Sequence, residues 1–244
     1  KKPENAERDI VTTPNFIVRE ILRQTASEII QGKDADQINT LKCADIACGS
    51  GAFLLELYQL LYDSLIDYYL DKDRSKLIQT SIDTFKLPYE IKRNLLVNCI
   101  YGVDKDFNAV EACKFGLLLK LLEDEDVNSL CDFHPILPDL SDNIFYGNSL
   151  LSTSDVSADE ALEINPFDFE NKSFDLIVGN PPYMKTEDIK AFTPKEKKLY
   201  EKGKRYVSAY KQYDKYFLFI ERALNLLKPH GFLGYIVPSK FMKV

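Results

Sequence analysis

The sequence predicts an α/β fold, an open and mostly parallel sheet with helices on both faces. Short apolar runs rich in β-branched residues alternate along the chain with longer segments whose apolar residues follow helical spacing, as expected for strands joined by crossover helices. Each predicted strand ends near a glycine or a polar residue, and ligands bind at the carboxyl ends of such strands. With 244 residues and 45% hydrophobic composition, the chain can form one large domain of this kind.

The predicted elements follow in chain order. The first helix is expected over residues 12–30, where Thr13 would be the N-cap and Pro14 would occupy the first helical position. Apolar runs predict strands over residues 41–47, 99–104, 143–151, 174–179 and 232–237. Helical spacing predicts helices over 52–70, 108–122 and 216–228, and two short helices within 71–98. A polar connector, loops and surface excursions are expected at 31–40, 123–142, 152–172 and 184–215.

The stretch FDLIVGNPPY, residues 174–183, ends a buried strand in a stiff turn. Each proline fixes its own φ at about −65° and restricts the residue before it, so Asn180, the Pro181 carbonyl and the Tyr183 ring have little freedom. These groups would form a rigid polar clamp beside an aromatic ring. The simpler alternative is a tight Pro-Pro turn with an exposed tyrosine.

A second strand end carries a glycine loop, DIACGSGAF, at residues 45–53. The order of strand, glycine loop and helix lets the backbone approach a ligand and points free N–H groups of the helix start at it. The pattern is D-x-A-x-G-x-G rather than the dinucleotide fingerprint G-x-G-x-x-G, so a zwitterionic or sugar-bearing ligand fits as well as a phosphate. The alternative is an ordinary glycine-rich connection.

Two further strand ends carry polar side chains. Asp104 ends the strand that follows the glycine loop, and its carboxylate can accept hydrogen bonds from two neighbouring ribose hydroxyls. Alternatively, Asp106 caps the next helix and Asp104 only solvates a turn. The next predicted strand ends at Asn148 and Ser149.

The charge of the chain is unevenly distributed. Its formal net charge of −7 argues against a protein coated in basic surface for nucleic acid. Residues 184–215, however, hold ten Lys or Arg against five Asp or Glu, a local balance of +5 that could face a polyanion. The alternative is a solvated, partly mobile loop.

The composition predicts a cytoplasmic protein. No apolar run approaches the roughly 18 to 20 residues of a transmembrane helix, and the amino-terminal residues lack the apolar core of a signal peptide. The five cysteines include no C-x-x-C pair and lie mostly in apolar segments, which favours reduced, buried thiols. The histidines, His134 and His230, are far apart in sequence, so no metal site is expected.

Taken together, these strand and helix ends resemble those of S-adenosylmethionine-dependent amino methyltransferases, most closely the N6-adenine DNA methyltransferases of restriction-modification systems. The matching stretches are TTP (12–14), DIACGSGAF (45–53), GVDKD (102–106), GNSL (147–150), NPPY (180–183) and the run from 213 to 241. The order of these motifs, with the cofactor motifs before NPPY, is similar to that of type I and type IIG enzymes. The resemblance covers nearly the whole chain, and the combination is more specific than any single motif.

The resemblance implies a Rossmann-like class I methyltransferase fold with S-adenosylmethionine as its cofactor and no metal. It assigns catalysis to Asn180, Pro181, Pro182 and Tyr183. It also implies a set of residues that contact the methionine, ribose and adenine parts of the cofactor. These are Thr13, Asp45, Ala47, Cys48, Gly49, Gly51, Phe53, Asp104, Lys105, Asn148, Ser149 and Asn180.

The implied reaction transfers a methyl group to the N6 amine of a flipped adenine. The lone pair of that amine is delocalised into the ring, so Asn180 and the Pro181 carbonyl would draw the nitrogen toward tetrahedral geometry by accepting its hydrogen bonds. Flipping the base costs a few kcal/mol, of which stacking on Tyr183 would return roughly 1 to 3 kcal/mol.

Other activities match less well. Cytosine C5 transfer needs a cysteine nucleophile, typically in a Pro-Cys pair, and no cysteine here follows a proline. Cytosine N4 enzymes usually carry S-P-P-Y at the clamp. Protein-glutamine methyltransferases of release factors also carry NPPY, but they have no counterpart of TTPNFIV and resemble the chain less after residue 184. A remaining alternative is a non-catalytic S-adenosylmethionine-binding module of a larger defence complex.

We expect residues 1–244 to be a methyltransferase catalytic domain that stops short of the last strands and of a target-recognition domain. Double-stranded DNA is the expected partner, contacted without sequence specificity through residues 184–215, with specificity supplied by the absent domain. A nuclease region or a specificity subunit is a further candidate partner, and no membrane is expected. The DNA recognition sequence is not predicted.

Overall fold

The computed structural model describes residues 13–169, 173–202 and 205–239. Five strands form one sheet in the order β5-β4-β1-β6-β7, and every neighbouring pair is parallel. The strands are β1 (Cys43–Asp45), β4 (Ile100–Asp104), β5 (Ile144–Tyr146), β6 (Phe174–Gly179) and β7 (Leu227–Tyr235). Each strand overlaps the apolar run that predicted it, so the predicted open α/β sheet is confirmed.

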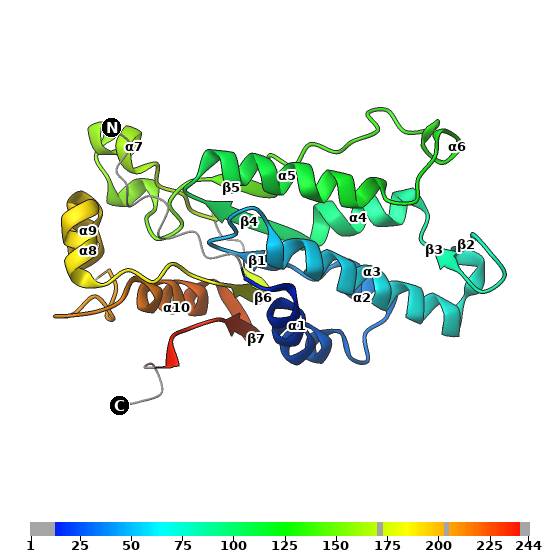
Figure 1. Ribbon diagram of the computed structural model, residues 1–244, viewed down its shortest axis with the longest axis horizontal. Coiled ribbons are helices and arrows are strands. Elements are labelled where there is room, and N and C mark those ends of the chain that lie inside the picture. The colour runs from blue at the N-terminus through cyan, green and yellow to red at the C-terminus, as the bar shows by residue number, and fades with distance from the viewer. Residues whose placement is uncertain (1–12, 170–172, 203–204, 240–244) are drawn as a thin grey trace.

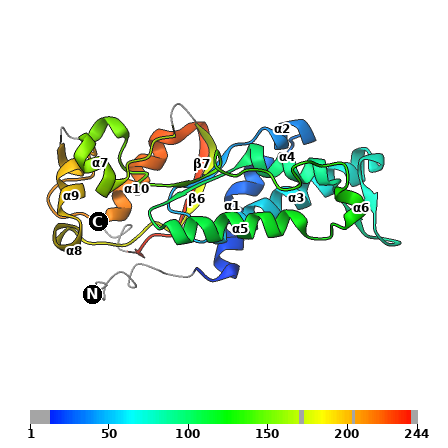
Figure 2. The same cartoon turned by 90° about the horizontal axis from the view of Figure 1, so that it is seen from above.

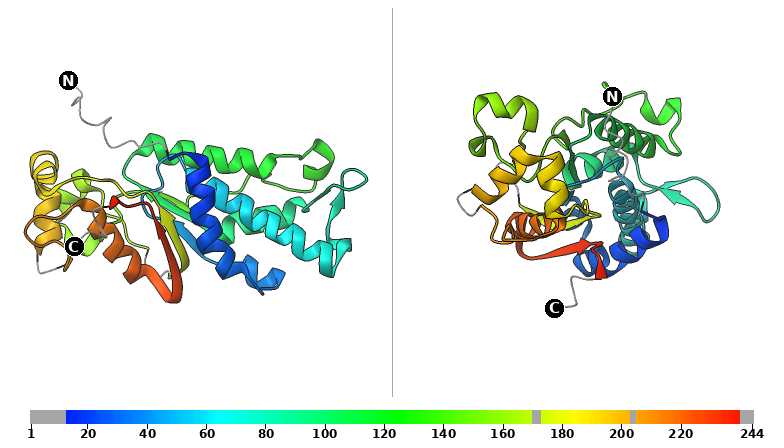
Figure 3. Two further views of the ribbon diagram at one scale, coloured as in Figure 1. Left: turned by 60° about the horizontal axis from the view of Figure 1, so that its bottom comes forward. Right: turned by 60° about the vertical axis from the view of Figure 1, so that its left-hand side comes forward.

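Helices cover both faces of this sheet (Figure 1). One hydrophobic core joins the sheet to α1 (Asn15–Ile30), α2 (Ala35–Asn39), α3 (Ala52–Lys72), α4 (Tyr89–Cys99) and α5 (Phe107–Leu122). The core of the other face includes α10 (Lys215–Leu226), and Figure 3 shows β7 between α1 and α10. In the described parts of the chain, no helix combines the length and apolar character needed to cross a bilayer.

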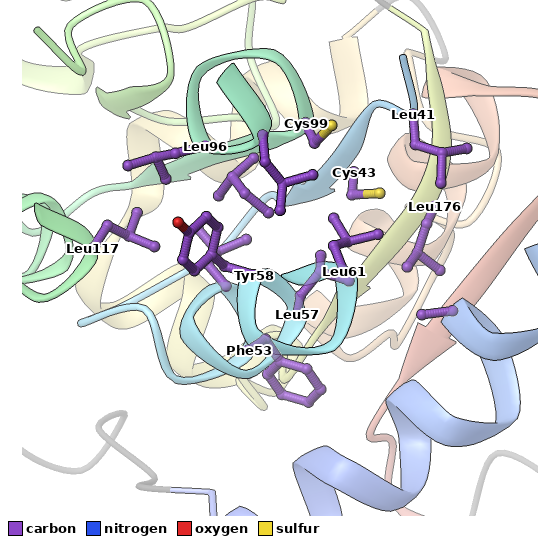
Figure 4. Close-up of a cluster of buried hydrophobic side chains, with 14 of the residues drawn as sticks. Leu41, Cys43, Phe53, Leu57, Tyr58, Leu61, Leu96, Cys99, Leu117 and Leu176 are labelled. Atoms are coloured by element: carbon purple, nitrogen blue, oxygen red, sulfur yellow. The ribbon is translucent and has the colours of Figure 1, made fainter. Parts of the chain in front are cut away.

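Alternating side chains of each strand supply the two cores, because successive residues of a strand point to opposite faces. In β6, Leu176 and Val178 belong to the core shared with α1 to α5, whereas Ile177 belongs to the core on the other face. Phe174 also lies in that other core, because the strand register shifts between Phe174 and Leu176. Figure 4 shows part of the first core, where leucines of α3 point toward the strands. The sheet is therefore buried on both faces, and chemistry is confined to the ends of its strands.

The cysteines are free thiols, as predicted, and all but Cys131 are buried. Burial in the first core raises the pKa of Cys43 and of Cys99, which keeps both as neutral thiols. Such thiols act as small apolar side chains rather than as nucleophiles.

The prediction of two short helices within residues 71–98 is wrong in its first half. After the end of α3 at Lys72 and a single 3-10 turn at Arg74–Lys76, residues Ile78–Gln79 (β2) and Phe85–Lys86 (β3) pair as a small antiparallel hairpin, and α4 follows it. Figures 1 and 2 show this hairpin at the opposite end of the molecule from α8 and α9. Leu87 and Pro88 lead from the hairpin into α4.

The prediction that residues 184–215 form a loop is also wrong. Residues Thr186–Phe192 (α8) and Pro194–Glu201 (α9) are helical, and Pro194 occupies the first turn of α9. The side chains of Ile189, Leu199 and Tyr200 are buried in the core on the α10 side of the sheet. These apolar contacts outweigh the lysine-rich composition that suggested a solvated loop.

Three smaller expectations need correction. Pro14, not Thr13, is the N-cap residue of α1, and no side chain caps this helix. The connector at residues 31–40 contains α2, which begins with a capping box between Asp34 and Gln37. The excursion at residues 152–172 includes α7 (Ala158–Ile164), and Phe169 beyond it is buried in the sheet's second core.

Candidate active site

The site lies where the strand order reverses. The chain builds β1, β4 and β5 outward in one direction and then returns to place β6 and β7 on the other side of β1. In open α/β sheets, ligands bind beyond the carboxyl ends of the strands at such a switch point. Here Asp45 ends β1 and Asn180 follows β6, so the glycine loop and the Asn-Pro-Pro-Tyr turn meet at this point.

Asn180 is held by two residues that the sequence assigned to the site. Its Nδ2 donates a hydrogen bond to Thr13 Oγ1 at 3.1 Å, and its Oδ1 accepts one from the Tyr183 hydroxyl at 2.5 Å. The backbone oxygen of Ile236 lies 2.9 Å from the same hydroxyl, so the single hydroxyl hydrogen is shared between the two oxygens. The amide orientation of Asn180 is therefore fixed from both ends. Thr12, the first threonine of the TTP stretch, lies outside the described residues.

The prolines and the tyrosine ring complete this turn. Pro181 is buried, Pro182 is half-buried, and Tyr183 is 37% exposed. The Tyr183 ring meets Tyr216 of α10 edge-on, with ring centroids 6.0 Å apart. One side of the tyrosine is thus packed against the protein, and the remainder is available to a ligand.

Asp45 lies directly beneath the clamp. Gly179 has φ +153°, and a Cβ built on it would lie 2.6 Å from Asp45 Oδ1, so only glycine fits between the strand end and this carboxyl group. The Asp45 side chain is 2% exposed and accepts a hydrogen bond from Ala47 N at 3.0 Å. Burial raises the pKa of Asp45 to about 8, with the nearby Asp104 charge adding to the effect.

Asp104 ties the glycine loop to β4. Its Oδ2 accepts a hydrogen bond from Gly49 N at 2.8 Å, and its Oδ1 accepts one from Asp106 N at 2.9 Å. Gly49 and Gly51 have φ of +52° and +91°, values that favour glycine. Asp106 caps α5 by accepting from Asn108 N and Ala109 N. The alternative role considered for Asp106 is thus correct, while Asp104 organises the loop rather than merely solvating a turn.

The turn after β5 is joined to its surroundings through both predicted residues. Ser149 Oγ donates to the Ile46 carbonyl at 2.7 Å, which links this turn to the glycine loop. Asn148 Nδ2 donates to the Tyr200 hydroxyl at 3.4 Å, and its Oδ1 accepts from Leu150 N at 3.1 Å. Lys105, next to Asp104, forms an ion pair with Glu196 of α9.

Two predicted cofactor residues are enclosed in the protein. Cys48 is 6% exposed, and a hydrogen bond with Cys113 together with burial raises its pKa. Phe53 is 3% exposed and belongs to the first core, where Figure 4 shows it at the start of α3. The side chains of both residues support the glycine loop from beneath, and a direct contact of either with a cofactor stays a prediction.

Three residues at this site were not predicted from the sequence. Glu196 and Tyr200 of α9 contact Lys105 and Asn148, but they lie in the segment that was expected to be a loop. The hydroxyl of Tyr235 is buried and has no hydrogen-bond partner among the described residues; burial raises its pKa, and the Asp45 carboxylate adds to the effect. Only the four-residue spacing of Glu196 and Tyr200 could have signalled a shared helical face.

Comparisons with known proteins show which family the chain resembles. A family model described as Eco57I restriction-modification methylase matches residues 98–244. Over all 244 residues the chain is 55% identical to the type II restriction enzyme and methyltransferase RM.Eco57I of Escherichia coli, of which it covers 24%. It is 29% identical over 195 residues to the type II methyltransferase M.BstVI of Geobacillus stearothermophilus, a match that covers 78% of this chain and 30% of that protein. The chain thus spans less than a third of the length of these relatives.

Solved structures show the same fold. The cryo-EM structure of a DrdV–DNA complex matches 98% of this chain and 21% of its own with a TM-score of 0.56 and 19% identity. A nuclease-deletion mutant of the type ISP restriction-modification enzyme LlaGI, in complex with a DNA substrate mimic, matches 93% of this chain and 18% of its own with a TM-score of 0.57 and 16% identity. With a family model that covers more than half of its length, the chain belongs to the Eco57I restriction-modification methylase family.

Proposed function

We propose that this chain is the methyltransferase catalytic domain of a restriction-modification enzyme and that it methylates the N6 amine of adenine in double-stranded DNA. The observation that carries the proposal is the fixed amide of Asn180, held between Thr13 and Tyr183 at the switch point of the sheet. Membership of a restriction-modification methylase family supports DNA as the substrate over the glutamine side chain of a protein. The relatives RM.Eco57I and M.BstVI, both described as type II methyltransferases, support the same choice.

The residues at the strand ends fit S-adenosylmethionine as the methyl donor. Each oxygen of Asp104 accepts one backbone N–H and keeps a lone pair for a ribose hydroxyl. A Cβ on Gly49 would meet no atom within 4 Å, so the loop borders open space, and the amino terminus of α3 follows it, where a carboxylate is stabilised. An ammonium group near the buried Asp45 would favour its ionised form.

The clamp acts on the amine of the flipped base. Bound S-adenosylmethionine supplies an electrophilic methyl group. Asn180 Oδ1 accepts one hydrogen bond from the amine, and the Pro181 carbonyl accepts the other. These bonds strengthen as positive charge develops on the amine nitrogen, which makes the stabilisation specific to the transition state. Asn180 is a neutral amide and no base, so the amine proton leaves to water after transfer. Holding the amine in a near-attack position contributes about 7 to 11 kcal/mol.

The DNA contact is assigned to the α8–α9 segment. Lys185, Lys190, Lys198 and Lys202 are exposed, and within the described ranges they take part in no ion pair. Lysines of this kind bind phosphates without reading the base sequence. The segment follows the clamp directly in the chain, and on this ground we assign it to the DNA that would carry the flipped base.

The test uses the full-length natural protein, radiolabelled S-adenosylmethionine and adenine-containing DNA. Wild-type protein should transfer label, and nucleoside analysis should find it on N6 of adenine. Asn180→Ala should abolish transfer, while calorimetry should show that S-adenosylmethionine still binds. Asn128→Ala, a change at an exposed asparagine of α6 (Val127–Leu130), is the matched control and should transfer at the wild-type rate.

Two outcomes would contradict the proposal. Near wild-type transfer by Asn180→Ala would exclude the clamp, and label on cytosine N4 or on protein would exclude adenine as the substrate. Binding of S-adenosylmethionine without any transfer by the full-length wild type would instead support a non-catalytic cofactor-binding module.

A further inference from the structure

Helix α9 buries a carboxylate and a hydroxyl against the strand ends. Glu196 is 7% exposed and Tyr200 is fully buried, although both lie in a segment that is otherwise rich in exposed lysines. They are one helical turn apart, and the Tyr200 hydroxyl donates to Glu196 Oε2 at 2.7 Å. A buried carboxylate is costly unless its charge and lone pairs are matched, so its partners are informative.

The partners of Glu196 come from two other elements. Lys105, which follows β4, donates from Nζ to Glu196 Oε1. Lys215, at the start of α10, places its Nζ 3.8 Å from Glu196 Oε2. Burial alone would raise the pKa of Glu196, but the two lysine charges and the hydrogen bonds hold it below the ordinary value, so the carboxylate is ionised at neutral pH.

Lys105 is thereby fixed at both ends of its side chain. Its backbone adjoins Asp104, the residue assigned to the ribose, and its ammonium group is held by Glu196. The side chain of Lys105 is still 41% exposed, so its methylene stem forms part of the surface beside the ribose site. A lysine stem held in this way offers a flat apolar surface, which a free lysine would not.

Tyr200 connects the same carboxylate to the turn after β5. Its hydroxyl accepts a hydrogen bond from Asn148 Nδ2 while donating to Glu196. Asn148 is only 2% exposed, so Tyr200 acts by fixing the shape of the 147–150 turn. One buried chain of hydrogen bonds therefore runs from Lys105 through Glu196 and Tyr200 to Asn148.

We propose that Glu196 is a positioning residue for the methyl donor: it holds the Lys105 stem across the adenosine end of the cofactor site, and Tyr200 fixes both Glu196 and the 147–150 turn. The inference rests on the proposed function, since it takes Lys105 and Asn148 as cofactor residues. It adds that α9, a helix of the segment assigned to DNA, also forms part of the wall of the adenosine pocket.

Calorimetry of the full-length protein with S-adenosylmethionine and with S-adenosylhomocysteine tests this role without relying on activity. Glu196→Gln should weaken the binding of both ligands five- to tenfold, and Tyr200→Phe, which removes only the hydroxyl, about threefold. Glu201→Gln on the same helix is the control, because Glu201 is exposed and pairs with Lys197; it should bind both ligands as the wild type does. In methyl transfer, Glu196→Gln should raise KM for S-adenosylmethionine and leave kcat unchanged.

A variant of Lys105 separates positioning from general support of the fold. Lys105→Met keeps an apolar stem that needs no anchor, so adding Glu196→Gln to it should cause no further loss of affinity. Additive losses in the double variant, or wild-type affinity in both Glu196→Gln and Tyr200→Phe, would overturn the inference. If Glu196→Gln fails to fold, the variants Tyr200→Phe and Lys105→Ala test the inference instead. Wild-type affinity for S-adenosylmethionine in both variants would refute the positioning role of Glu196. A wild-type protein that binds no S-adenosylmethionine would refute the proposed function instead.

Discussion

The side-chain amide of Asn180 donates a hydrogen bond to the hydroxyl of Thr13, a residue 167 positions earlier in the chain. Because the amide nitrogen is engaged on that side, the amide oxygen must face the other, where the Tyr183 hydroxyl donates to it. An oxygen held in this way has a second lone pair for the amine of a substrate. Thr13, two residues before α1, thus helps to orient the proposed clamp, although it lies far from Asn180 in sequence.

Replacing Thr13 should impair catalysis through the orientation of Asn180. In Thr13→Val the methyl group that replaces the hydroxyl cannot accept the amide hydrogen bond, so the amide can rotate and present its nitrogen. We expect kcat for methyl transfer to fall about tenfold, which corresponds to about 1.4 kcal/mol. Thr13→Ser keeps the hydroxyl and should retain most of the rate. Equal rates in Thr13→Val and the wild type would show that Asn180 is oriented by other contacts.

Asp45 should make stability depend on pH. Its pKa is raised by burial from an ordinary 3.8 to about 8, so between these values the folded protein binds more protons than the unfolded chain. The neutral Asp45 carboxyl group therefore contributes to the free energy of unfolding in full below about pH 4. This contribution is lost as the pH rises toward 8, by up to about 1.4 kcal/mol per pH unit. Urea unfolding of wild type and Asp45→Asn from pH 4 to 9 should show the difference in unfolding free energy changing in this direction. A pH-independent difference would contradict it.

Gly179 should not tolerate a side chain. Its φ of +153° is rarely adopted by other residues, and a Cβ would collide with the buried Asp45 carboxyl group. Gly179→Ala should lower the free energy of unfolding by about 1 to 3 kcal/mol and displace Asn180. Gly116→Ala is the control: it lies inside α5, its Cβ would meet Leu55 at an ordinary 3.5 Å, and it should stabilise the protein by about 0.5 to 1 kcal/mol. Denaturant titration checks both values.

Glu125 should be important for stability, although it lies outside the site. Its side chain is 1% exposed and pairs with Lys92, which is 4% exposed, at 2.7 Å, and with Lys86 at 3.1 Å. Glu125→Ala leaves buried positive charge without its partner and should cost about 3 to 5 kcal/mol of unfolding free energy. Glu20→Ala, which breaks the exposed pair with Arg23, should change it by less than about 0.5 kcal/mol. Similar losses of unfolding free energy in Glu125→Ala and Glu20→Ala would refute the distinction between the buried and the exposed ion pair.

The exposed lysines of the α8–α9 segment should bind DNA phosphates. The double variant Lys190→Gln/Lys198→Gln should weaken binding to DNA of any sequence. It should also reduce the slope of log affinity against log salt concentration by about 0.9 for each phosphate that a lysine no longer neutralises. The matched control is Lys72→Gln/Lys76→Gln near the β2–β3 hairpin, at the opposite end of the molecule. An equal effect of the control, measured by fluorescence anisotropy, would indicate only a general charge effect.

The sequence predicted most reliably those features that depend on local rules. The strand leading to Gly179 and the rigid turn after it follow from an apolar run and two prolines, and the Asp106 cap follows from helix-start chemistry. The β2–β3 hairpin was missed because strands of two residues carry no measurable periodicity. The helices α8 and α9 were missed because their few buried apolar residues, such as Ile189, are outnumbered by lysines.

Contacts between distant segments were less accessible from sequence. Thr13 was assigned to the site only by resemblance to a family, and its local pattern suggested a helix cap instead. The Lys105–Glu196 pair joins residues 91 positions apart, and no local pattern links a residue after β4 to a helix after β6. Such pairs depend on the order of the strands in the sheet, because that order brings the segments after β4 and β6 together.

The central place of β1 also has a consequence for synthesis of the chain. Its Ala44 pairs with Ile177 of β6, which leaves the ribosome about 130 residues later. At 5 to 20 residues per second, one side of this strand waits roughly 7 to 26 seconds for its neighbour, with unpaired backbone groups exposed to other chains. The glycine loop can form against β4 early, whereas the nascent protein acquires the turn with Asn180 only after that wait. Chaperones that cover exposed strand edges would therefore act in the interval between the two halves of the site.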